Sequence, residues 1–85
     1  MRKLEWSPTA RKDLTYWQAT DMKKYHKILE ICRNITVVPH KGIGKPEPLK
    51  HEWSGCWSRR IDKEHRLIYR FDEETVYILK ARYHY

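Results

Sequence analysis

Residues 56–85 read CWSRRIDKEHRLIYRFDEETVYILKARYHY, a stretch in which apolar and polar side chains alternate. Alternation with a period of two predicts β-strands, here over 56–62, 65–71 and 75–85, joined by the short polar turns DKE and DEE. Because connections this short join antiparallel neighbours, the stretch predicts an antiparallel sheet.

The predicted sheet has one apolar and one basic face. On the second strand, Leu67, Tyr69 and Phe71 share the apolar face. On the third strand we assign Tyr77 and Leu79 to that face, together with the alternate residues that follow them. The opposite face carries the cationic and imidazole side chains of these strands: Arg66, Arg70, Lys80, Arg82 and His84.

The N-terminal half of the chain predicts two helices. Ser7 is a good N-cap, and Pro8 suits the first helical position because that position needs no N–H donor. Apolar residues at helical spacing then predict a first helix over 8–19. Asp21 is placed to cap a second helix with its own apolar face, and Pro39 ends it.

These elements predict the fold class α+β, with two N-terminal helices packed on one face of an antiparallel sheet. A short strand is expected over 2–6, and residues 1–85 form one domain. The segment 40–55 has no periodicity and holds all three glycines and two of the four prolines, so we interpret it as a functional loop.

Charge and composition indicate the kind of partner and compartment. The 85 residues carry 18 Lys and Arg against 11 Asp and Glu, a net charge of +7, which favours a polyanion such as nucleic acid. The start MRKLEWSP does not resemble a signal peptide, and no apolar run is long enough to cross a membrane. Two cysteines without a motif favour inert thiols in a reducing compartment, so we expect the cytoplasm. The five histidines lack zinc-ligand spacing, and we expect no metal or other cofactor.

Several polar residues together provide the parts for cleaving RNA without a metal. Such cleavage needs a base for the ribose 2′-hydroxyl, an acid for the departing 5′-oxygen and cations for the charge at phosphorus. Glu47, held between two prolines, is the candidate base, and His84 is the candidate acid because a free imidazole titrates near pH 6.5. The candidate phosphate-binding cations are Arg60, Arg66, Lys45 and Lys50.

The same surface also fits a protein that binds RNA or a ribosomal site without cutting it. Exposed rings would then stack on bases, the candidates being Trp53, Trp57, Tyr83 and Tyr85. In so small a domain some rings must be core, and we assign Trp17, Trp57 and Tyr69 there first.

Four separated motifs resemble one known family. They are GKPEPLKH (44–51), SG-WSRRI (54–61 without Cys56), EHRLIY (64–69) and the final RYHY (82–85), and the stretches LEWS and YWQATD nearer the N-terminus also fit. In this order they resemble the YoeB-type toxins of the RelE superfamily over essentially the whole chain.

The resemblance implies a toxin of a bacterial toxin–antitoxin pair, with a fold related to microbial ribonucleases. It implies an endoribonuclease that cuts messenger RNA in the ribosomal A site and so stops translation. It implies an acidic antitoxin segment that covers or distorts the active surface, and a possible homodimer. The roles it implies are general base for Glu47, general acid for His84, phosphate stabilisation for Arg66 with Arg60 and Lys50, and an active-site ring for Tyr85. A degenerate toxin kept as a repressor partner is the remaining alternative, which the complete set of Glu47, Arg66 and His84 disfavours.

Overall fold

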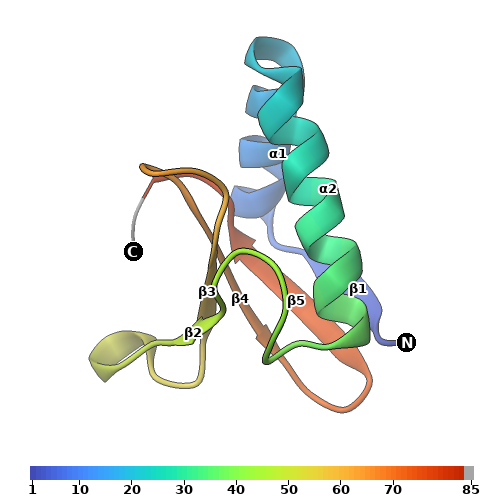
Figure 1. The fold of residues 1–85 in the computed structure, drawn as a ribbon, viewed down its shortest axis with the longest axis vertical. Coiled ribbons are helices and arrows are strands. Elements are labelled where there is room, and N and C mark those ends of the chain that lie inside the picture. Colours follow the sequence, from blue (N-terminus) through green and yellow to red (C-terminus); the bar gives the residue numbers. More distant parts are fainter. Residues whose placement is uncertain (84–85) are drawn as a thin grey trace.

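Two helices cover one face of a five-stranded sheet (Figure 1). The structure is a computed structural model and describes residues 1–83. His84 and Tyr85, the candidate acid and active-site ring, lie outside the described residues. The elements in chain order are β1 (Lys3–Trp6), α1 (Pro8–Thr20), α2 (Met22–Val37), β2 (Glu47–Pro48), the 3-10 helix η1 (His51–Trp53), β3 (Trp57–Arg60), β4 (Arg66–Phe71) and β5 (Thr75–Lys80).

Local capping explains where the helices begin. The Ser7 hydroxyl accepts a hydrogen bond from the Ala10 N–H at 3.0 Å, with Pro8 as the first residue of α1. The Asp21 carboxylate accepts from the N–H groups of the second and third residues of α2, at 3.1 and 3.3 Å. Both predicted helix starts are therefore confirmed, and α2 ends at Val37, two residues before the proline that was expected to end it.

The sheet confirms the predicted α+β fold class and adds one feature to it. Its strand order is β1-β5-β4-β3-β2, and β3, β4 and β5 pair antiparallel as predicted. The short strand β2, which falls in the segment interpreted as a loop, adds a further antiparallel pair with β3. The N-terminal strand β1 joins the edge parallel to β5, so the complete sheet is mixed. A parallel pair between the two ends of a chain needs a long crossover, which here is supplied by α1, α2 and the strands that follow.

Two predictions about the last strand were wrong. First, β5 ends at Lys80 and does not continue to residue 85, because the Ala81 N–H bonds to a side chain on α1 and Tyr83 has a φ of 63°. Second, Val76 and Ile78 lie in the core, whereas Tyr77 pairs with Arg70 on the other face. Apolar residues occupy both faces of β5, and a register shift opposite Ile68 and Tyr69 changes the alternation.

The core lies between the helices and one face of the sheet. Fully burying one valine, leucine or isoleucine side chain stabilises a fold by about 1.5–3 kcal/mol. Most of the fully buried members come from both helices and from the interior strands β4 and β5, and Ala81, directly after β5, joins them: Ala10, Ile28, Ile31, Ile35, Leu67, Tyr69, Val76, Ile78 and Ala81. Trp17 and Tyr69 are core residues as predicted, and Trp57 is half-buried against the same cluster.

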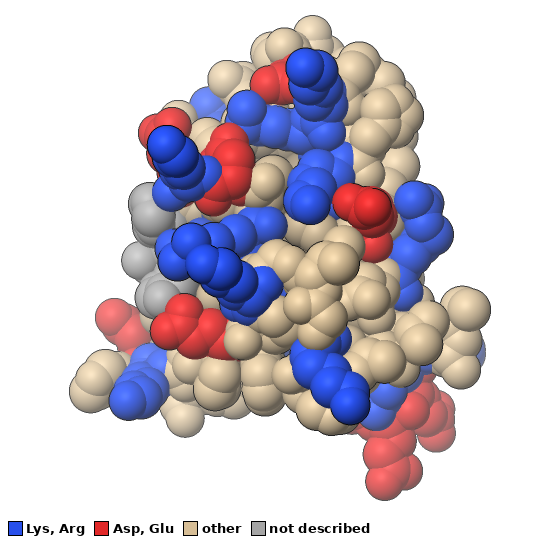
Figure 2. All heavy atoms as spheres, viewed as in Figure 1, with Lys and Arg blue, Asp and Glu red and all other residues tan. Residues whose placement is uncertain are grey.

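The surface is basic, as the net charge of +7 requires. Figure 2 shows Lys and Arg side chains spread across one face of the molecule, with the acidic side chains in smaller groups. Within residues 1–83, no helix is both long enough and apolar enough to span a bilayer.

The two cysteine thiols differ in environment, and this predicts different reactivities. Both are free; Cys32 is buried on α2, and burial raises its pKa to about 12, whereas Cys56 is half-exposed. Because the thiolate is the reactive form, Cys32 is expected to be inert at pH 8. Titration of the native protein with a disulfide reagent should modify about one thiol quickly, and denaturation should release the second. Cys56→Ser should remove the fast phase. Two fast thiols in the folded protein would contradict this assignment.

Candidate active site

Glu47 lies on the short edge strand β2, which the sequence did not reveal as a strand. It pairs with Ser58 of β3 and is exposed. The flanking prolines are tolerated because β2 is an edge strand whose other side needs no ladder hydrogen bonds. The preceding loop is also docked on the sheet, since the Arg60 N–H donates to the Gly44 carbonyl at 2.7 Å.

Gly44 explains why that docking requires a glycine. Its φ is +81°, and a Cβ there would lie 3.2 Å from the Arg59 Cβ and 3.2 Å from the Arg60 carbonyl oxygen. A side chain would therefore be strained by the backbone conformation and would crowd β3 at the point where the loop leading to Glu47 is docked.

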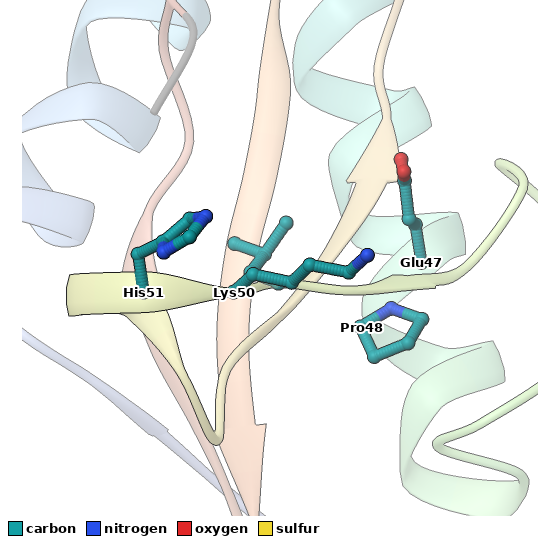
Figure 3. A pocket seen from close by; sticks show the side chains of 5 residues that line it. Glu47, Pro48, Lys50 and His51 are labelled. Carbon is teal, nitrogen blue, oxygen red and sulfur yellow. The ribbon is translucent and has the colours of Figure 1, made fainter.

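A hollow of about 270 Å³ lies beside this strand. Figure 3 shows Glu47 and His51 rising on the same side of the segment, with the Lys50 ammonium extending back toward Glu47. The hollow thus places a carboxylate, an ammonium and an imidazole along one open rim. His51, with a φ of 61°, was not among the predicted site residues, although it directly follows Lys50 in the sequence. The lining residues are Glu47, Pro48, Leu49, Lys50 and His51.

Arg60 and Arg66 are direct cross-strand partners on β3 and β4. They lie on the face opposite the core, because Leu67, next to Arg66, faces the helices. Glu47 is opposite Ser58, two residues from Arg60, so Glu47 and Arg60 are diagonal neighbours on this face, with Cα atoms about 7–8 Å apart. The strand register therefore brings the candidate base and the two candidate arginines onto one surface.

The end of the described chain reaches the same surface. The main-chain N–H of Arg66 donates to the main-chain carbonyl of Tyr83 at 3.0 Å, so the segment that precedes His84 runs alongside β4. Within residues 1–83, the Arg66 Nε donor is buried and has no hydrogen-bond partner. An unpaired buried donor is unfavourable, and an anion bound to this guanidinium would relieve part of that cost.

Lys45 directly follows Gly44, whose carbonyl accepts the hydrogen bond from the Arg60 main-chain N–H. It is exposed, has a φ of 51° and precedes Pro46 at the end of the docked loop, outside the lining of the hollow. Among residues 1–83, no three His, Cys, Asp or Glu side chains gather as metal ligands would.

Arg59 is the residue whose role the sequence analysis missed. It is fully buried, and its three guanidinium nitrogens make five hydrogen bonds. The acceptors come from α2, from the loop that follows α2 and from β4: the Asn34 side chain, the Tyr69 hydroxyl and the carbonyls of Val38, Lys41 and Ile43. Arg59 thus ties the loop leading to Glu47 onto the sheet. Its position two residues after Trp57 places it on the core face, which was the available signal.

Comparison with known proteins identifies the class of molecule that carries this fold and surface. The family model described as YoeB-like toxin of bacterial type II toxin-antitoxin system matches residues 6–85. Toxin RelK of Mycobacterium tuberculosis is 51% identical over 85 residues, covering 100% of both chains. The molecule is therefore of the class of small bacterial toxins that act in toxin–antitoxin pairs.

Solved structures agree with the sequence match. The YoeB dimer from Staphylococcus aureus superposes with a TM-score of 0.91 at 41% identity, covering 99% of this chain and 98% of that one. The heterotetrameric YoeB-YefM toxin-antitoxin complex from the same organism gives a TM-score of 0.90 at 41% identity, covering 100% and 99%. This chain belongs to the YoeB toxin family. The resemblance drawn from its four motifs is confirmed.

Proposed function

We propose that this toxin is an endoribonuclease that cleaves messenger RNA in the ribosomal A site by attack of a ribose 2′-hydroxyl, without a metal. The observation that carries the proposal is the strand register, which aligns Glu47, Arg60 and Arg66 on one face, with the Tyr83 carbonyl bonded to the Arg66 main-chain N–H. A carboxylate, two guanidinium groups and a following imidazole are the groups that such a reaction needs.

Each group has a definite task in the proposed reaction. Glu47 takes the proton from the 2′-hydroxyl, and its exposure lets it reach a substrate held over the sheet. The 2′-oxygen then bonds to phosphorus and the 5′-oxygen departs, taking a proton from His84. Cations stabilise the charge on the phosphoryl oxygens as it develops: Arg66 and Arg60 from the strands, and Lys50 and Lys45 from the loop. Tyr85 supplies a ring at the same site.

The proposed partners follow from the charge and from the relatives. A net charge of +7 favours association with messenger and ribosomal RNA. Because a relative from Staphylococcus aureus forms a complex with the antitoxin YefM, we propose a cognate antitoxin that covers or distorts this surface. Another structure of that relative is a dimer, which supports self-association of this chain. Translating ribosomes place its action in the cytoplasm.

The proposed function is tested by primer extension on a messenger that is being translated in the presence of the protein. Discrete new 3′ ends at A-site codons are expected, and they should disappear when the same RNA is supplied without ribosomes. Inhibited translation with an intact messenger would contradict cleavage and support the RNA-binding or ribosome-binding module instead.

Glu47→Gln tests the role of the base separately. If Glu47 accepts the proton, the rate of cleavage by the wild type should fall on the acidic side of its pH profile, as the carboxylate protonates. The glutamine variant should lose that acidic limb and be slower by about 10²–10⁴-fold. Glu52→Gln, on the exposed 3-10 helix, is the matched control and should behave as wild type. A variant that is slow but keeps the acidic limb would show that Glu47 only orients another group.

A further inference from the structure

Residues 81–83 are held to the body of the protein by side chains that the proposed chemistry does not use. The Ala81 N–H donates to Asp13 Oδ2 at 2.9 Å, and the Ala81 carbonyl accepts from Trp17 Nε1 at 2.8 Å. Both side chains belong to α1, one helical turn apart. The donor and the acceptor of a single residue are thus fixed by the same helix face, directly after β5 ends.

His65 holds the next part of the segment. Its Nδ1 accepts a hydrogen bond from the Tyr83 N–H at 2.7 Å, while the Tyr83 carbonyl accepts from the neighbouring Arg66 N–H at 3.0 Å. Tyr83 has a φ of 63°, which costs free energy for a residue other than glycine. The paired bonds on both sides of Tyr83 explain why this conformation is kept.

The His65 ring is itself well fixed. It is 7% exposed, and it packs edge-on against Trp17 with ring centroids 4.7 Å apart. Its main-chain N–H donates to Asp62 Oδ1 at 2.7 Å, and Nε2 faces Glu64 Oε1 at 3.6 Å. Because Nδ1 is an acceptor, the neutral ring carries its proton on Nε2. Packing therefore fixes the position of the His65 ring, and the hydrogen bond from Tyr83 fixes the tautomer of the neutral ring.

We propose that Asp13, Trp17 and His65 are positioning residues, which hold residues 81–83 so that the chain enters His84 in the orientation that proton transfer needs. This inference rests on the proposed function, in which His84 is the acid. A role in packing alone would not require hydrogen bonds to both main-chain groups of Ala81 and both main-chain groups of Tyr83, two residues whose own side chains are respectively small and exposed. Misplacing a catalytic group by about 1 Å can cost about 10²-fold in rate.

Two substitutions at His65 separate the hydrogen bond from ring packing. His65→Phe keeps an aromatic ring beside Trp17 but loses the acceptor for the Tyr83 N–H. His65→Asn loses the ring but keeps an acceptor, the amide oxygen, near the position of Nδ1. On programmed ribosomes we expect His65→Phe to lower kcat by about 10–100-fold with KM within about twofold, because the RNA-binding cations are untouched. His65→Asn should keep kcat within about fivefold of wild type.

Asp13 offers a second pair of variants, and both should preserve the fold because Asp13 is only half-buried. Asp13→Ala removes the acceptor for Ala81 and should lower kcat, whereas Asp13→Asn retains an acceptor oxygen and should not. The ranking of the variants by kcat is the decisive result. A His65→Asn protein that is slower than His65→Phe, or a His65→Phe protein with the kcat of wild type, would overturn the proposal.

Hydrogen exchange of the Tyr83 amide gives a readout that does not depend on RNA. It should be slow in the wild type and in His65→Asn, and faster by about tenfold or more in His65→Phe while core amides stay protected. Unchanged exchange in His65→Phe would show that the bond does not hold the tail. If the wild type cuts no RNA, the proposed function fails, whereas the exchange result still decides whether His65 anchors the segment.

Discussion

Arg59→Met is expected to lower the free energy of unfolding by about 3–5 kcal/mol. The substitution fills a similar volume but leaves several buried acceptors without a donor, each worth about 1–3 kcal/mol. Within residues 1–83 no carboxylate pairs with Arg59, so the carbonyl oxygens of the loop after α2 and the Asn34 amide oxygen on α2 compensate its charge. Urea unfolding followed by tryptophan fluorescence measures the loss directly.

Arg60→Met is the matched control, because it removes the same side chain one position away. Arg60 is exposed, so its unfolding free energy should change by no more than about 0.5 kcal/mol, even if catalysis suffers. Arg59→Lys should lie between the two, since an ammonium supplies three donors where the guanidinium uses five. An Arg59→Met protein within about 1 kcal/mol of wild type would mean that the loop relaxes and finds other donors.

The parts of the fold that sequence predicts well are those fixed by neighbours in the chain. Ser7 and Asp21 cap helices through N–H groups two or three residues away, and the turns after Asp62 and Asp72 are closed in the same way. Such contacts are written into short motifs, so both helices and the order of the three last strands could be anticipated.

The parts that sequence missed depend on residues far apart in the chain. The parallel pairing of β1 with β5 joins segments about 70 residues apart, and Glu47 becomes part of a strand only because β3 offers it a partner. The wrong assignment of side chains to the two faces of β5 has another cause. Tyr77 and Ile78 are both apolar enough for the core, and only the register shift between β4 and β5 decides which of them faces it.

The candidate site likewise has a part that the sequence predicts and a part that depends on contacts between distant residues. Residue types alone indicated a carboxylate, arginines and an imidazole as candidate reacting groups. Whether Glu47 and Arg66 share a surface could not be settled by type, because that depends on how β2, β3 and β4 align. The supporting residues were hidden for a further reason: Arg59 and His65 resemble exposed polar residues in the sequence, and only burial reveals what they hold.

Removing the side chains of His84 and Tyr85 should abolish toxicity while leaving the fold intact. The described core and all four bonds that hold residues 81–83 lie within residues 1–83, so the unfolding free energy should change by no more than about 0.5 kcal/mol. If His84 is the proposed general acid, its loss should slow the proposed cleavage by about 10²–10⁴-fold, and growth arrest on expression should fail.

The form of this variant matters because of Arg66. A protein truncated after Tyr83 would carry a new carboxylate at the carbonyl that accepts from the Arg66 N–H, close to the proposed phosphate site. That charge could block RNA by itself, so a truncation would confuse loss of the acid with repulsion of the substrate. The full-length double variant His84→Ala/Tyr85→Ala avoids the difficulty, and the two proteins should differ in RNA affinity but not in their failure to cleave. If the double variant cuts ribosome-bound messenger at a rate within about threefold of wild type, the acid lies elsewhere, and His51 on the rim of the hollow is the next imidazole to test.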